Sequence, residues 1–159
     1  MNNKAVYEAP VVKEQKEIKL VGLRVLCEGD QYIHEIPKAS TALQSQLPSI
    51  QHVVDPSKQI GAFIVDASTV QEDGYWVCVE VENFENVPAG MVTLTIPPQR
   101  YASIQHVGRN EEIKDTYERL HKWTQKNGYV RLLNNWHIEV FYSFNNVDRL
   151  KIELYDTIQ

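Results

Sequence analysis

The sequence has little of what several classes of protein require. Only two of its 159 residues are cysteine, Cys27 and Cys78, and they match no metal or redox spacing. Both lie in apolar, strand-like runs, so we expect reduced and buried thiols. The start has no apolar run of signal-peptide length, and no later segment approaches the roughly 18 apolar residues of a membrane span. These absences predict a soluble, cytoplasmic protein without a membrane partner.

Basic residues and cofactor motifs are also scarce. The chain has 16 Lys and Arg against 21 Asp and Glu, a formal net charge of −5, which argues against nucleic-acid binding through a basic face. Its five histidines are scattered, without the spacing of a zinc site. Neither a Gly-rich phosphate loop nor a Gly-x-Ser-x-Gly elbow is present. We therefore expect no metal and no cofactor.

What the chain does contain is one order of elements, twice. Residues 1–16 are polar and predict a loose arm or a short edge strand. Apolar patterns in residues 17–84 predict a strand, a helix and two strands, and the same order returns in residues 92–159. We predict a single domain, residues 17–159, of the α+β class. It consists of duplicated β-α-β-β units forming a curved, antiparallel-rich sheet with two helices on one face.

The predicted helix of the second unit has a clear apolar stripe. Asn110 is in position to cap its start, and Gly128 marks its end. The side chains expected to pack on the sheet recur at helical spacing and are Ile113, Tyr117, Leu120 and Trp123.

The strand predicted for residues 136–143 carries one residue that does not fit. Alternation puts Glu139 on one face with His137 and Phe141. The more apolar face carries Trp136, Ile138, Val140 and Tyr142. A carboxylate flanked by aromatic side chains suggests a lined cavity. The alternative is an ordinary solvated strand face, because Glu is mostly exposed in proteins.

Four stretches together resemble one known family. They are Val87-Pro88-Ala89-Gly90, the Ile-Pro-Pro-Gln-Arg-Tyr-Ala run of residues 96–102, His106-Val107-Gly108, and the helix ending in Asn127-Gly128-Tyr129. They resemble the small-molecule-binding domain of the gyrase-inhibitor-like superfamily, which also forms the effector-binding half of AraC-type and MerR-type regulators. The resemblance implies a ligand cavity lined by a glutamate with an aromatic residue two positions later, which Glu139 and Phe141 match. Since no helix-turn-helix module precedes the domain, we expect no DNA binding by this chain on its own.

The candidate ligand-binding residues follow from the chemistry of such a glutamate. A carboxylate in apolar surroundings is costly to ionise alone, a cationic ligand offsets that cost, and aromatic faces attract the cation. Glu80 becomes a second carboxylate of the site if its strand face is the one that holds Glu139; otherwise it is solvated. The aromatic candidates, for each of which core packing is the alternative, are Phe63, Trp76, Tyr101, Phe141 and Tyr142.

Three functions remain open. The first is a stand-alone protein that holds a lipophilic, cationic small molecule between the two repeats. The second is a hydrolase of small electrophilic compounds, as some stand-alone superfamily members are, with Glu139 as general base. A tyrosine hydroxyl within hydrogen-bond reach of Glu139 would favour the enzyme, and an aromatic box around one carboxylate the binder. The third is a gyrase-inhibitor-like module for an unidentified protein partner.

Overall fold

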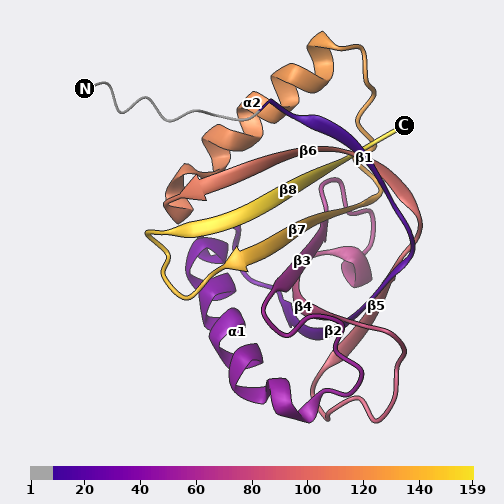
Figure 1. Ribbon diagram of the computed structural model, residues 1–159, viewed down its shortest axis with the longest axis vertical. Helices are drawn as coiled ribbons and strands as arrows, with labels where there is room; N and C mark the ends of the chain where they lie inside the picture. The colour runs from indigo at the N-terminus through magenta and orange to yellow at the C-terminus, as the bar shows by residue number, and fades with distance from the viewer. Residues whose placement is uncertain (1–8) are drawn as a thin grey trace.

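The order of the strands reveals the duplication. The computed structural model describes residues 9–159, and its eight strands form one antiparallel sheet in the order β1-β6-β8-β7-β3-β4-β2-β5. Exchanging β1 to β4 for β5 to β8 gives the same order read from the other end, so the two units are related as by a two-fold axis. The helices are α1 (Tyr32–Gln46) and α2 (Ile113–Lys126). The strands are β1 (Val11–Gln15), β2 (Ile18–Val25), β3 (Gln59–Ile64), β4 (Tyr75–Val81), β5 (Val92–Ile96), β6 (Gln99–Gly108), β7 (Trp136–Ser143) and β8 (Leu150–Ile158) (Figure 1).

The first unit begins with an edge strand. β1 pairs with β6 from Val11 to Gln15. Of the two predictions for the polar start, a loose arm or a short edge strand, the edge strand is therefore correct for residues 11–15. Residues 1–8 lie outside the described residues. β1 leads almost directly into β2, which pairs with β5 near the opposite edge. The second unit repeats this path through β5 and β6. Pro97 and Pro98 separate those two strands because proline has no N–H to donate to a ladder.

Both faces of the sheet are covered, each in a different way. α1 packs over the half formed by β2 and β4, and α2 over the half formed by β6 and β8, so both helices lie on one face (Figure 1). The opposite face holds one apolar cluster that joins Leu20 of β2 and Ile96 of β5 to Tyr101 of β6 and Tyr155 of β8. Because these strands lie far apart in the order, the sheet curves around this cluster. The structure thus confirms the predicted α+β class and the helices on one face.

The start of α2 differs from the prediction. Asn110 opens a short 3-10 turn (Asn110–Glu112), and the residue at the N-cap position of α2 is Glu112, which makes no side-chain cap hydrogen bond. Its Nδ2 instead donates to the carbonyl oxygen of Ile33, 3.2 Å away in α1. The expected capping role of Asn110 is therefore wrong, and the residue ties the beginnings of the two helices together.

The apolar stripe of α2 faces the sheet as predicted, although its members are buried to different degrees. Leu120 is fully buried, whereas Ile113, Tyr117 and Trp123 are partly buried against the cluster of β6 and β8. Within residues 9–159, neither α-helix nor any shorter helix has the length and apolar character needed to cross a membrane.

Candidate functional site

A cavity of about 460 Å³ lies under α1 where the two units meet. This volume falls in the range of small-molecule sites. The pairing of β3 with β7, from Gln59↔Phe141 to Ile64↔Trp136, joins the units and forms the floor. Most of the lining is apolar or aromatic, and it is drawn from both helices, four strands and the loops after β3 and β7: Tyr32, Ile33, Ile36, Pro37, Phe63, Ile64, Val65, Tyr75, Ile113, Phe141, Phe144, Val147 and Leu150.

Glu139 is the buried carboxylate of this cavity, with 7% of its surface exposed. Its Oε1 accepts a hydrogen bond from the hydroxyl of Tyr75 on β4. Its Oε2 accepts one from the hydroxyl of Tyr117 on α2, 2.5 Å away. Each tyrosine belongs to a different unit, so the carboxylate is held by the first and second halves of the chain together.

The proton affinity of Glu139 reflects two opposing effects. Burial raises its pKa above the usual value, and the hydrogen bonds from Tyr117 and Tyr75 lower it without cancelling that rise. Burial and the neighbouring carboxylate raise the pKa of both tyrosines well above their usual value. At neutral pH the two hydroxyls therefore remain protonated and serve as donors to Glu139.

A glycine makes room for one of these hydroxyls. Gly61 lies directly across the ladder from Glu139, and a Cβ atom added there would fall 1.8 Å from the Tyr75 hydroxyl oxygen. Glycine inside a strand commonly marks such a close approach. Two residues further along β3, the ring of Phe63 stacks on that of Tyr75 with centroids 5.8 Å apart. Tyr75 of the first unit is thus held against the Glu139 carboxylate of the second unit.

The charges around the cavity have one sign. Among the described residues that line it, Glu139 and Asp73 are acidic, and none is Lys, Arg or His. Glu139 lies deep, whereas Asp73 is exposed. No group of three or more His, Cys, Asp or Glu side chains within residues 9–159 is placed to hold a metal ion.

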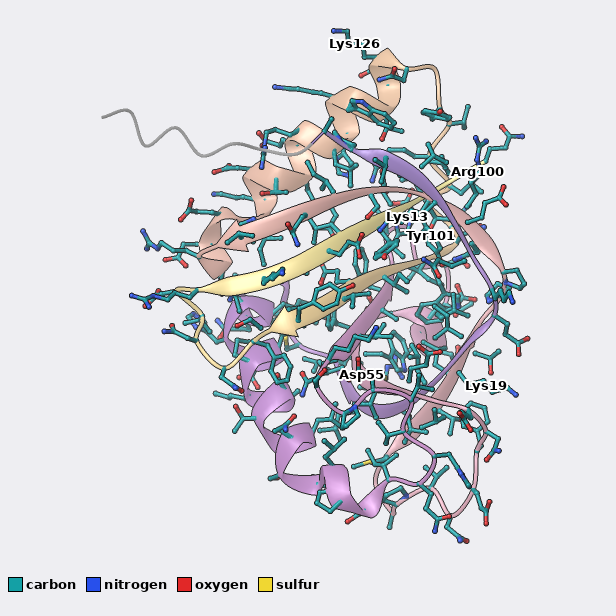
Figure 2. The ribbon with its side chains drawn as sticks, in the orientation of Figure 1. Lys13, Lys19, Asp55, Arg100, Tyr101 and Lys126 are labelled. Atoms are coloured by element: carbon teal, nitrogen blue, oxygen red, sulfur yellow. The ribbon has the colours of Figure 1, made fainter. Side chains whose placement is uncertain are left out.

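The structure brings together three of the seven residues selected from the sequence. Glu139, Phe63 and Phe141 line the cavity. Trp76 and Tyr101 lie in the apolar cluster on the other face of the sheet, and Figure 2 shows Tyr101 beside Lys13, its partner on β1.

Tyr142 and Glu80 do not line the cavity either. The Tyr142 hydroxyl donates to Glu153 at 3.2 Å. Glu80 lies at every second position along β4 from Cys78 and Trp76, and so on the face of the sheet that holds their apolar cluster. The prediction that these four residues share a cavity with Glu139 is therefore wrong. The physical reason is strand alternation, since Tyr75 and not Trp76 points toward the helices.

Two residues of the site were not expected from the sequence. Tyr117 was assigned to the apolar stripe of its helix, and its ring does pack there while its hydroxyl reaches Glu139. Tyr75 opens a strand and carried no signal of its own. Gly61 was the available clue, because a glycine within an apolar strand indicates that another group approaches closely.

Replacing Gly61 with alanine is expected to displace the Tyr75 hydroxyl from Glu139. The added Cβ overlaps a buried ring, so the free energy of unfolding should fall by about 1–3 kcal/mol, the usual cost of overpacking. Gly29→Ala is a matched control, because nothing lies within 4 Å of a Cβ there, and its stability should be unchanged or slightly higher. Urea denaturation of both variants measures the difference, and equal stabilities would contradict the close approach.

The raised pKa of Glu139 predicts a pH-dependent gain in stability for Glu139→Gln. Between the unfolded-state pKa and the higher folded-state pKa, the unfolded chain loses a proton that the folded chain keeps. The wild-type protein therefore loses stability as pH rises through this interval, by about 1.4 kcal/mol for each pH unit that separates the two values. The variant has no such loss, so its advantage grows with pH and then levels off.

Urea denaturation of both proteins at a series of pH values from about 4 to about 8 measures this advantage. A difference that does not depend on pH would mean that Glu139 titrates as it does in the unfolded chain.

Comparison with known proteins adds a family and a set of similar folds. A model of the family Cass2, described as integron-associated effector binding protein, matches residues 12–158. No curated protein matches the chain. Two solved structures cover nearly the whole chain. SAV2435 bound to tetraphenylphosphonium has a TM-score of 0.73 at 12% identity and covers 96% of this chain and 94% of its own. The EcmrR C-terminal domain has a TM-score of 0.67 at 18% identity, with 97% and 98% covered.

A third solved structure of the same fold is a hydrolase from Listeria innocua. Its TM-score is 0.58 at 11% identity, and the match covers 94% of this chain and 91% of the other. At identities this low, all three likenesses show the fold alone.

Proposed function

This chain belongs to the family of integron-associated effector binding proteins, and from the chemistry of its cavity we propose that it binds a lipophilic cation between its two units. The observation that carries the proposal is the carboxylate of Glu139. It lies buried in an apolar cavity, and none of the described residues that line this cavity is cationic. A cation from solution is the partner that such a carboxylate lacks.

The free-energy balance favours a bulky, weakly hydrated cation. Ionising a buried carboxylate is costly, and a positive ligand offsets that cost by direct attraction. The rings of Phe141 and Phe144 add cation–π attraction, and Phe63, whose ring stacks on Tyr75 and His137, adds apolar contact. The hydroxyls of Tyr75 and Tyr117 already hold the carboxylate in place, so little reorganisation accompanies binding.

The known structures support this choice of ligand. The solved protein SAV2435, which shares the fold, is bound to tetraphenylphosphonium, itself a lipophilic cation. The net charge of −5 supports cationic ligands and weighs against DNA as a partner of this chain alone.

Binding of tetraphenylphosphonium to Glu139→Gln tests the proposal. The variant keeps the shape of the side chain and removes its charge, so affinity for the cation should fall roughly 10- to 100-fold. Affinity for triphenylphosphine oxide, a neutral compound of similar groups, should change little. Isothermal titration calorimetry with both compounds gives the two dissociation constants.

Glu80→Gln is the matched control, because it removes a partly buried carboxylate on the opposite face of the sheet. It should leave both affinities unchanged. Equal losses for cation and neutral compound in Glu139→Gln would show that Glu139 shapes the cavity without selecting charge. No binding of the cation to the wild-type protein would overturn the proposal.

One observation favours the hydrolase as a second candidate. A tyrosine hydroxyl within hydrogen-bond reach of Glu139 is the feature expected of an enzyme, and two such hydroxyls reach it. In an epoxide hydrolysis, Glu139 would take a proton from water, whose oxygen bonds to the ring carbon as the ring C–O bond breaks. A tyrosine hydroxyl would protonate the leaving oxygen and regain its proton from Glu139. The raised pKa of Glu139 suits a general base.

Styrene oxide is a suitable probe for this second candidate. An enzyme of this kind should convert it to the diol, and Glu139→Gln should abolish the conversion while the compound still binds. Mass spectrometry of the product mixture measures the gain of one water. If the wild-type protein produces diol no faster than buffer alone, or if the variant retains the activity, this second function is excluded for epoxides.

A further inference from the structure

A buried ionic cluster lies behind the cavity without lining it. The carboxylate of Asp156 on β8 has no exposed surface. Arg131 binds it through both ends of the guanidinium, with Nε 2.6 Å from Oδ2 and Nη2 3.2 Å from Oδ1. His137 on β7 places its Nδ1 3.1 Å from Oδ1. Burial alone would raise the pKa of Asp156, but His137 and Arg131 hold it below the usual value, so this carboxylate is ionised.

The cluster reaches Tyr75 through two stacked rings. The Nε2 of His137 donates to the carbonyl oxygen of Leu132, 3.1 Å away, and its Nδ1 accepts from the backbone N–H of Thr157 at 3.2 Å. These hydrogen bonds and the Asp156 carboxylate beside Nδ1 fix the ring. Phe63 stacks on that ring with centroids 5.6 Å apart. Its ring also stacks on Tyr75, 5.8 Å away, so the order of contact is Asp156, His137, Phe63, Tyr75 and then Glu139.

A second route leads from the cluster to Tyr117. The Nε2 of His121 on α2 lies 3.8 Å from Oδ2 of Asp156 and has no hydrogen-bond partner although it is buried. The ring of His121 packs against that of Tyr117 with centroids 5.7 Å apart. The two routes start at one carboxylate, Asp156, and end on the two oxygens of another, Glu139.

We propose that Asp156 and its partners Arg131, His137 and His121 are positioning residues for the ligand site, which hold the two tyrosine hydroxyls on Glu139. None of the four lines the cavity. Stacked and packed rings in a dense interior transmit displacement because few voids absorb it. If the cluster is broken, the rings of Phe63 and His121 lose their fixed neighbours and the hydroxyls move off the carboxylate.

The inference rests on the proposed function in that it assigns these residues to the ligand site, but its test needs no ligand. The titratable groups that face Glu139 are Tyr75 on β4, Tyr117 on α2 and His137 on its own strand. The ¹³C carboxyl resonance of Glu139 in the unliganded protein reports its titration midpoint. In Asp156→Asn this midpoint should rise by about one pH unit, as expected when a hydrogen bond to the charged form is lost.

A double-mutant cycle separates positioning from other effects. The rise should vanish when Asp156→Asn is combined with Tyr75→Phe and Tyr117→Phe, because no hydroxyl is left to move. A rise that persists in that background would show that the effect reaches Glu139 without the tyrosine hydroxyls, and would overturn the inference. So would an unchanged midpoint in Asp156→Asn.

Matched variants keep the test decisive. His106→Asn removes another buried histidine, whose Nδ1 lies 2.7 Å from the Thr116 hydroxyl oxygen, and it should leave the midpoint of Glu139 unchanged even if stability falls. If Asp156→Asn does not fold, His121→Asn replaces a side chain that is 35% exposed. His121→Asn should raise the titration midpoint of Glu139 by less than Asp156→Asn does. This rise should vanish when His121→Asn is combined with Tyr117→Phe, because Tyr117 is the one of the two tyrosines whose ring packs against His121. Failure of the wild-type protein to bind tetraphenylphosphonium would bear on the proposed function and not on these midpoints.

Discussion

The antiparallel pairing of β3 with β7 is the constraint on which the rest of the structure depends. Within residues 9–159 it is the ladder that joins the two units at the centre of the sheet, and its register sets Gly61 against Glu139. A shift by one residue would turn every side chain of one strand to the other face. The carboxylate would then enter the apolar cluster that holds Trp76 and Tyr101, and the cavity would lose its buried charge.

The two faces of the sheet differ in what they hold: one holds a continuous apolar cluster and the other holds the cavity. The face without helices packs aromatic and aliphatic side chains from seven strands into one continuous cluster, whose burial contributes favourable free energy to folding. The helical face is interrupted, since α1 and α2 cover separate halves. The gap between those halves leaves space for a cavity and a buried carboxylate, which cost stability and are tolerated because the other face is tightly packed.

Much of the fold was predictable because its signals are local. The helical stripe of Leu120 and its neighbours, the prolines at residues 97 and 98, and the repeated order of elements all follow from nearest-neighbour chemistry. Glu139 was found for a similar reason, as a charge within an apolar strand. Trp76 and Tyr101 were misassigned because aromatic character does not reveal which face of a sheet a strand presents. Tyr75 and Tyr117 come from distant segments, and only the register of β3 against β7 brings them to one carboxylate.

The hydrogen bond from Asn110 to Ile33 has a consequence for how the cavity opens. Both residues line the cavity, and this exposed 3.2 Å contact joins the beginnings of α1 and α2 there. A single hydrogen bond of this kind contributes about 0.5–1.5 kcal/mol, whereas parting two strands would break a whole ladder. The beginnings of the helices are therefore the weaker boundary of the cavity and the β3–β7 ladder is the stronger one, so a ligand of the proposed kind would enter between the helices.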